Sequence, residues 1–474
     1  MGFVNFCKAV GRGYNRMSLI VRILIGMVIG IILALAVPTW TWIAVFGDLF
    51  VGALRGIAPI LVFFLIISAL ARARSGVDKR FARVIVLYLL GTFLASLCAV
   101  VASFLFPQTM TLTDAVVKDA PSGIGEVLSN LLMNLVSNPV DALLNANYIG
   151  ILVWAICLGV IFRRVAANTT KTMLINISDA ISTLVRWVIN FAPFGIMGLV
   201  FNSVSTSGLD IFVDYGKLLL LLVCVMLFVA LVVEPVMASV VLRRNAWPLV
   251  LRCLKDSGIT AFFTRSSAAN IPVNMALCSK LGLDQDLYSV SIPLGATINM
   301  CGASVTIAIM SLTAANTLGI PVDLPTAVIL CLLATIGACG ASGVAGGSLL
   351  LIPMACSLFG IGNDIAMQVV GVGFIISVIQ DSLETALNSS GDVIFTATAE
   401  YREWLNQGRT LPKFWGPDAD EFAGMGDADH KGLGEESDEA AAVEESVAQT
   451  ARADASGEPA GAPRPSGEGD ARSK

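Results

Sequence analysis

The chain has 474 residues, of which 56% are hydrophobic and only 14% are charged, with a formal net charge of −5 and a mean hydropathy of +0.79. Because soluble domains contain about 25% charged residues, this composition excludes an ordinary soluble protein. The apolar runs are roughly 18 to 30 residues long, enough to cross about 30 Å of hydrocarbon. The sequence therefore predicts an all-α polytopic membrane protein.

Six apolar spans come first along the chain. They are expected at about 18–37, 45–71, 82–107, 147–163, 172–202 and 216–242. The first is too long for the apolar core of a cleaved signal peptide, so we expect it to stay as an anchor. Basic residues gather before the first span and after the second, fourth and sixth, whereas the alternate loops hold few. By the positive-inside rule, both termini are predicted to be cytoplasmic.

The region from about 248 to 401 is apolar but repeatedly interrupted. Two segments broken by small and polar residues, 256–281 and 327–358, are each followed by a helix-like stretch, 285–315 and 363–401. These two stretches are predicted to be interrupted in turn, at "NMCG" (299–302) and at "NSSG" (388–391). Paired interrupted segments indicate a weak internal repeat and the binding site of a transporter.

The remaining segment, from about 416, is rich in Glu, Asp, Ala, Gly and Pro and is predicted to be disordered. It contains the chain's single histidine, His430, to which we assign no role. The ten cysteines include no CxxC pair, so the sequence predicts neither a metal site nor a disulfide framework.

The stretch "QDSLETALNSSGD" places carboxylates where an apolar helix should continue. At 100° per residue, Asp381, Glu384, Thr385, Asn388 and Asp392 fall within an arc of about 100°. An aspartate at membrane depth costs about 2.5–3.5 kcal/mol, so such residues normally face a cavity, an ion or a partner. The pattern favours a site for a cation and an ammonium group, although a helix that has already left the bilayer would also carry such residues.

The other interrupted segments support a binding site less strongly. In "TRSSAANIP", serines and backbone N–H groups suit an anionic group, although a surface turn would look alike. "NMCG" frees backbone carbonyls to line a polar cavity, or is only a glycine kink. "GACGASGVAGG" suits a mobile gate, or is only small-residue packing.

Together, "TRSSAANIPV", "PLGATINMCG", "ATIGACGASG" and "DSLETALNSSGD" resemble the dicarboxylate/amino acid:cation symporters, the glutamate-transporter family. The resemblance covers roughly residues 18–405 and is strongest to the bacterial serine/threonine:sodium symporters. It implies eight transmembrane helices, two re-entrant helical hairpins with inverted repeats, a homotrimer and an elevator fold. A scaffold (mainly 18–72 and 120–206) would carry a sliding transport part (mainly 82–107 and 212–405, with hairpins at about 248–281 and 324–358). Residues 1–17 and 406–474 would be the cytoplasmic N-terminus and the tail.

The resemblance also implies site residues. Substrate would be bound by Asp381, Asn388, Thr385, Glu384, Ser266, Ser267, Arg265 and Met300. Within this set, Asp381 would hold the ammonium group and Asn388 the carboxylate. The first sodium would be held by Asp392, Asn388, Asn299 and Gly295, the second by carbonyls near Thr297, Thr335, Ile336 and Ala338. Gly337, Gly340 and Gly343 would form the gate.

Three departures from the family's pattern bear on the substrate and the ions. Glu384 stands where acidic-substrate members have an arginine, and a glutamate would repel a side-chain carboxylate. The family's NMDGT is here NMCGA, so Cys301 removes the carboxylate of a third sodium site and Ala303 replaces a threonine. Arg265 is hypothesised to pair with Glu384.

The sequence is thus interpreted as a sodium-coupled importer of L-serine and L-threonine in the bacterial cytoplasmic membrane, surrounded by lipid. We expect no enzymatic activity, no organic cofactor and no nucleic-acid partner. Proton coupling, or a dicarboxylate substrate, remains the alternative within the family. An intramembrane hydrolase and an ion channel are weaker alternatives, the first because the spans contain no histidine.

Overall fold

A computed structural model describes residues 17–72, 79–112, 136–341 and 346–412, together with Gly125, Ser129, 132–134 and Phe414. These residues form helices and connecting turns, with no β-strand among them. The helices from Ile23 onward belong to one compact unit, Ile23–Ala423. The proposed gate residue Gly343 and the acidic tail beyond Phe414 lie outside the described residues.

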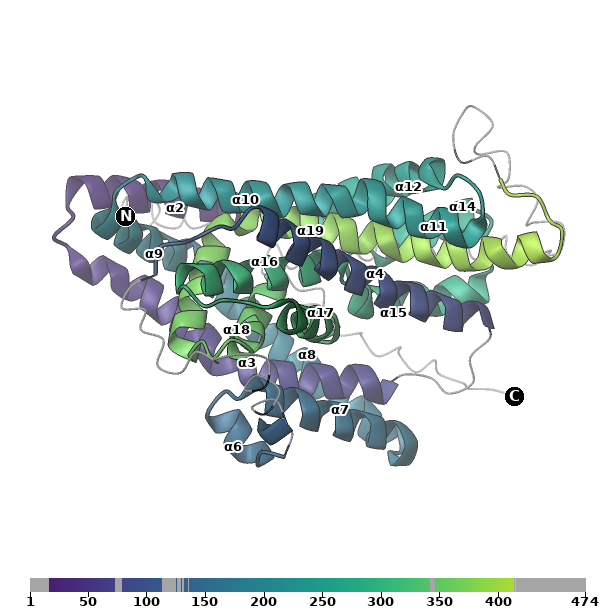
Figure 1. Cartoon of the computed structure of the whole chain (residues 1–474), viewed down its shortest axis with the longest axis horizontal. Coiled ribbons are helices and arrows are strands. Elements are labelled where there is room, and N and C mark those ends of the chain that lie inside the picture. Colours follow the sequence, from purple (N-terminus) through teal and green to yellow (C-terminus); the bar gives the residue numbers. More distant parts are fainter. Residues whose placement is uncertain are drawn as a thin grey trace, which may run out of the picture. The chain divides into compact units, whose positions relative to one another are not determined.

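The first half of the chain forms α2 to α11 (Figure 1). Their bounds are α2 Leu19–Ala36, α3 Val45–Arg72 (preceded by the short η1, Thr41–Ala44), α4 Lys79–Leu105, α6 Pro139–Leu144, α7 Tyr148–Val165, α8 Asn168–Asn190, α9 Ala192–Ser207, α10 Ile211–Phe228 and α11 Glu234–Leu242. A π-helical turn, Val229–Val233, joins α10 to α11 without a break. The predicted span 172–202 is divided at Phe191, because Pro193 starts a new helix there.

The second half of the chain forms α12 to α19 (Figure 1). Their bounds are α12 Trp247–Cys253, a π-helical turn Leu254–Gly258, α13 Ile259–Thr264, α14 Ile271–Lys280, α15 Gln285–Ile298, α16 Cys301–Thr317, α17 Leu324–Ala338, η4 Ser348–Leu351, α18 Ile352–Ser357 and α19 Asn363–Asn406. Helices α13 and α14 form one helix–turn–helix unit, and α17 with η4 and α18 forms a second.

Eight helical stretches of the described residues are long and apolar enough to cross a membrane. In Gln285–Thr317 and Asn363–Asn406, 94% and 83% of the most apolar window is buried inside the protein, against 50% or less in the other six. These two stretches are therefore the core around which the other helices pack. Figure 1 shows α19 running between α10–α11 and α4, which all contact it.

Of the two predicted interruptions, the structure has one. Between α15 and α16 the helix breaks at Asn299 and Met300, as "NMCG" predicts. The prediction of a break at "NSSG" is wrong, because α19 is helical throughout. Ser390 keeps its hydroxyl inside this helix by donating a 2.7 Å hydrogen bond to the Ala386 carbonyl.

Candidate functional site

The predicted polar face of α19 is entirely buried. Asp381, Glu384, Thr385, Asn388 and Asp392 are between 0% and 6% exposed. Since these groups are buried, each carboxylate needs partners within the protein. The side chains divide into two clusters, one around Asp381 and Glu384 and one around Asn388 and Asp392.

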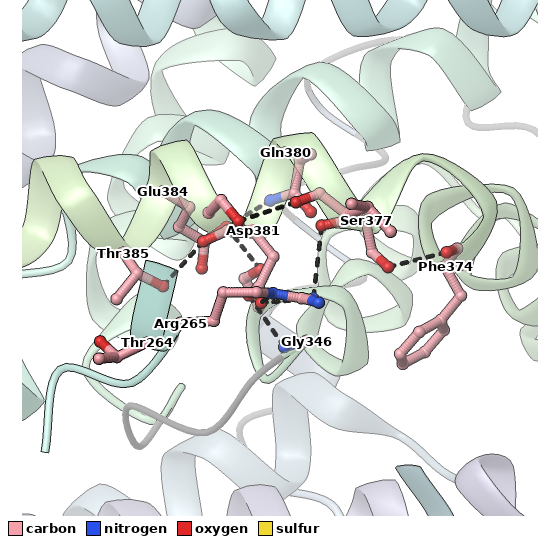
Figure 2. A network of polar contacts seen from close by, with 12 residues as sticks. Thr264, Arg265, Gly346, Phe374, Ser377, Gln380, Asp381, Glu384 and Thr385 are labelled. Atoms are coloured by element: carbon pink, nitrogen blue, oxygen red, sulfur yellow. Dashed lines mark hydrogen bonds and ion pairs between the residues drawn. The ribbon is translucent and has the colours of Figure 1, made fainter. Parts of the chain in front are cut away.

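Asp381 lies where the two helix–turn–helix units meet α19. Its Oδ2 accepts a 2.7 Å hydrogen bond from Arg265 Nε, and Arg265 Nη2 is also 2.7 Å away (Figure 2). Its Oδ1 accepts a 2.9 Å hydrogen bond from the backbone N–H of Gly346. The carboxylate is therefore satisfied from one unit by a guanidinium and from the other by a backbone amide.

Arg265 has an uncommon backbone conformation. It caps α13 in the left-handed region, with a φ of 52°. A non-glycine residue with positive φ is uncommon and often marks a functional constraint. Here the conformation ends α13, and the guanidinium, which is only 7% exposed, also donates to the Ser377 carbonyl at 3.4 Å.

Glu384 has hydroxyl and amide partners instead of a cation. Its Oε2 accepts hydrogen bonds from Thr306 Oγ1 (2.8 Å), Ser348 Oγ (2.8 Å) and Gln380 Nε2 (2.6 Å). The hypothesised pairing of Arg265 with Glu384 is therefore wrong for this conformation. Arg265 binds Asp381, the carboxylate one helical turn earlier (Figure 2), whereas Glu384 accepts a hydrogen bond from Thr306 of α16.

The second cluster surrounds the break between α15 and α16. Asn299 Nδ2 donates at 3.0 Å both to the Asn388 carbonyl and to Asp392 Oδ1. The Gly302 N–H donates at 2.7 Å to Asn388 Oδ1, and Asn388 Nδ2 lies 3.4 Å from Met300 Sδ. The non-helical backbone of the break thus packs against the polar face of α19. At membrane depth, non-helical backbone is tolerated where it is buried in the protein in this way.

Gly295 brings the end of α15 against the same carboxylate. A Cβ atom at this position would lie 2.6 Å from Asp392 Oδ1 and 2.8 Å from the Tyr88 hydroxyl. Only a glycine allows this approach. The four residues predicted for the first sodium, Gly295, Asn299, Asn388 and Asp392, therefore lie together.

The residues predicted for the second sodium lie at two helix ends. Thr297 is at the end of α15, while Thr335, Ile336 and Ala338 are at the end of α17. The two ends meet where Cys339 Sγ contacts the Ile298 carbonyl at 3.7 Å. The hydroxyls of Thr297 and Thr335 donate their hydrogens within their own helices. Their oxygens keep lone pairs, so these hydroxyl oxygens and the backbone carbonyls at the helix ends are the oxygens that a cation could bind here.

The remaining predicted residues occupy the turns. Ser267 is buried between α13 and α14, and Ser266 Oγ accepts a 3.2 Å hydrogen bond from the Ala269 N–H. Thr385 donates its hydroxyl to the Asp381 carbonyl at 2.7 Å, inside α19. Of the gate residues, Gly337 lies within α17 and Gly340 in the turn after it.

Several buried polar residues that the sequence analysis did not single out complete the site. Asn270 Nδ2 donates to Ser389 Oγ at 2.8 Å, and Asn274 Nδ2 to the Ser389 carbonyl at 2.9 Å. Both asparagines stand in "TRSSAANIPVNM", and their spacing of four residues places them on one face of α14. Glu234 was also missed, although it is an isolated acid in an apolar run of more than twenty residues.

Comparison with known proteins gives consistent matches over the membrane region. Residues 19–401 match the sequence profile of the sodium:dicarboxylate symporter family. A serine/threonine transporter SstT of Bifidobacterium adolescentis is 61% identical over 408 residues, which is 86% of this chain and 95% of the relative. A protein of the same name from Streptococcus thermophilus is 58% identical over 393 residues, 82% of this chain and 98% of the relative. A third, from Streptococcus agalactiae, is 58% identical over 391 residues, 82% and 97%.

Proposed function

The chain belongs to the sodium:dicarboxylate symporter family, and from this premise we propose that it imports L-serine and L-threonine together with sodium. The names of its relatives, serine/threonine transporters that are 58% to 61% identical, support the choice of substrates. The observation that carries the proposal is the buried Asp381 carboxylate, which is reached by both helix–turn–helix units.

Asp381 has the right charge and neighbours to hold the ammonium group of an amino acid. Its present partners, Arg265 and the Gly346 N–H, are hydrogen-bond donors that an ammonium group would replace. Once released, the Arg265 guanidinium and the tip of the first unit (with Ser266 and Ser267) would be free to bind the substrate carboxylate together with Asn388. Met300 and Thr385 would complete the substrate site.

Glu384 supports a neutral substrate. It is 5% exposed and lies one helical turn from Asp381, so a second carboxylate on the substrate would enter a region that is already negative. At 4 Å and an effective dielectric constant of 20, two like charges repel by about 4 kcal/mol. Serine and threonine add only a hydroxyl, which the donors and acceptors around Glu384 can accommodate.

Sodium binding is proposed at the two sets of oxygens described above. Asp392 with the carbonyls of Gly295, Asn299 and Asn388 offers the hard oxygen ligands that alkali cations prefer. The carbonyls at the ends of α15 and α17 would form the second site, so that its closure depends on the second helix–turn–helix unit. Coupling follows if sodium and substrate each favour the conformation in which that unit is closed.

The architecture we propose is that of an elevator transporter. The units α13–α14 and α17–α18 would be re-entrant hairpins, and a homotrimeric scaffold containing α3, α7 and α8 would hold a sliding part containing α4 and α10–α19. Glycines 337, 340 and 343 would let the second hairpin open. The protein would lie in the cytoplasmic membrane with both termini in the cytoplasm.

The test is uptake of radiolabelled L-serine into proteoliposomes under an inward sodium gradient or an equal potassium gradient. We expect sodium-dependent uptake that excess threonine blocks and excess aspartate does not. Uptake that responds to a pH gradient and not to sodium would contradict sodium coupling. Uptake of aspartate in place of serine would contradict the role given to Glu384.

A further inference from the structure

Glu234 is a buried acid without a partner. It is 0% exposed, and neither of its carboxylate oxygens has a hydrogen-bond partner among the described residues. An ionised carboxylate that is buried without a partner is among the most costly arrangements in a protein. Because Glu234 belongs to none of the motifs that carry the proposed site, it needs a separate explanation.

The local helix geometry directs Glu234 toward the core. It is the first residue of α11 and directly follows the π-helical turn Val229–Val233. Such π-turns are rare and frequently occur at functional sites, because the extra residue re-aims the side chains that follow. Helix α11 packs directly on α19, the helix that carries the predicted ion ligands.

Gly391 shows which residues Glu234 faces. A Cβ atom at Gly391 would lie 2.9 Å from Glu234 Oε1 and 2.8 Å from Asn299 Nδ2. The glutamate oxygen and the asparagine amide thus converge on one point beside α19. Asp392, which directly follows Gly391 in the sequence, accepts a 3.0 Å hydrogen bond from the same Asn299 amide nitrogen.

Asp392 also has a carboxylate oxygen without a hydrogen-bond partner in the described part of the chain. Its Oδ1 accepts from Asn299, but its Oδ2 is fully buried and has no partner among the described residues. Both oxygens of Glu234 and one of Asp392 are therefore buried acceptors without donors. Two carboxylates that repel each other in the absence of donors are stabilised by a cation between them.

We infer that Glu234 is a sodium ligand, which joins Asp392 in one ion site on the α11 side of α19, where the Asn299 amide holds Asp392 Oδ1 by its hydrogen bond. The inference rests on the proposed function, since it assigns a further ligand to the proposed sodium site. The ion site would then include a carboxylate from α11, outside the interrupted segments. Gly391 would leave room for that side chain, because it has no Cβ atom.

The decisive test is equilibrium binding of radioactive sodium to the purified full-length protein, comparing the unsubstituted protein with Glu234→Gln. The substitution keeps the shape of the side chain and removes its charge. We expect sodium affinity to fall by about tenfold or more, as is typical when a group that supports a metal site is lost. Glu400→Gln is the matched control, because Glu400 is also buried but accepts hydrogen bonds of 2.9 and 3.0 Å from the Asp284 N–H.

A second measurement, of thermal stability, distinguishes loss of sodium binding from loss of folding. The increase in Tm that sodium chloride gives relative to choline chloride should be present in the unsubstituted protein and in Glu400→Gln, and reduced in Glu234→Gln. If Glu234→Gln gives no folded protein, Glu234→Asp decides: weaker sodium binding supports the inference and unchanged binding overturns it.

The outcomes separate the two proposals. If the unsubstituted protein binds no sodium, the proposed function fails and the inference fails with it. If it binds sodium and Glu234→Gln binds equally well, only the inference is overturned, and Glu234 is a neutral buried acid.

Discussion

Asp381 and Glu384 lie one turn apart on α19 and yet have opposite surroundings. Asp381 is paired with Arg265, whereas Glu384 accepts from two hydroxyls and an amide. The difference explains how one buried face can carry two carboxylates. Asp381 is neutralised by Arg265, which the substrate ammonium group replaces in the function we propose, and Glu384 remains an acceptor.

Asp381→Asn should abolish high-affinity substrate binding. The substitution removes the charge that pairs with Arg265 and, in our account, with the substrate ammonium group. A charge-assisted hydrogen bond contributes about 1.5–3 kcal/mol, so we expect serine affinity to fall by about 10- to 100-fold. Asp214→Asn is the control, because Asp214 forms only a partly exposed ion pair with Lys217. Serine affinity that is equal in the two variants would contradict the role of Asp381.

Glu384→Gln should relax the discrimination against acidic substrates. The amide oxygen can still accept from Thr306 and Ser348, so the packing around it is retained. With one negative charge fewer in the site, aspartate should become about tenfold more effective as a competitor of serine uptake. This change in affinity is smaller than the full repulsion between two close like charges would give. Competition curves for aspartate and threonine measure this. An aspartate curve identical to that of the unsubstituted protein would mean that Glu384 does not face the substrate.

At the scale of the element, α15–α16 is broken and α19 is continuous. The break exposes the Asn299 side chain and the Gly302 N–H to the intact helix, and α19 supplies the acceptors. The site thus combines one interrupted helix, α15–α16, with one continuous helix, α19. Among the described residues, the hydrogen bonds that the break supplies to Asn388 and Asp392 come from Asn299 and Gly302.

The sequence was sufficient to predict most of the helical spans, the break at "NMCG" and the polar face of α19, because all three follow from local pattern; the division of the span 172–202 at Phe191 was missed. It did not predict the continuity of α19, since serine and glycine are compatible with either a break or a close approach. Neither the Arg265–Asp381 pair nor the place of Glu234 was predicted. Both depend on contacts between residues more than 100 positions apart.

Gly391→Ala should disturb the ion cluster without breaking α19. Its Cβ would lie 2.8 Å from Asn299 Nδ2 and 2.9 Å from Glu234 Oε1, so one of them has to move. Overpacking of this kind typically costs about 1–3 kcal/mol of stability. We expect a lower Tm and a higher sodium concentration for half-maximal uptake.

Gly371→Ala is the matched control on the same helix, because its added Cβ would meet only ordinary contacts of 3.5 Å or more. If both substitutions left Tm and sodium dependence unchanged, the close approach at Gly391 would have no role in ion binding.

At the scale of the whole molecule, the proposed elevator movement requires a boundary between a fixed part and a sliding part. A largely apolar cavity of about 690 Å³ is lined by residues of α3 and α7 and by residues of α4, α15 and α17. Among its lining residues are Ile66 of α3 and Ile336 and Cys339 of the proposed second hairpin region. Loose packing at this boundary is compatible with relative movement, which a tightly interdigitated core would resist.

A disulfide across this boundary should stop transport. A Cβ atom at Gly340 would lie 3.1 Å from Ile66 Cγ1, so cysteines at 66 and 340 are near disulfide distance. In a background without the ten native cysteines, oxidation of the double variant should abolish serine uptake, and reduction should restore it.

The control pair replaces Leu70 and Gly159, which come into contact within the proposed scaffold. Its oxidation should leave uptake intact. Uptake that survives the crosslink between 66 and 340 would contradict a sliding movement along this boundary.

The central claim is that the polar face of α19 binds serine and sodium together. It is tested most directly by binding of tritiated L-serine to the purified protein in sodium chloride or potassium chloride, for the unsubstituted protein and for Asp392→Asn. We predict that serine binds only in sodium, and that Asp392→Asn raises the sodium concentration required by about tenfold or more. Serine binding of equal affinity in potassium, or an unchanged sodium requirement in Asp392→Asn, would contradict the account.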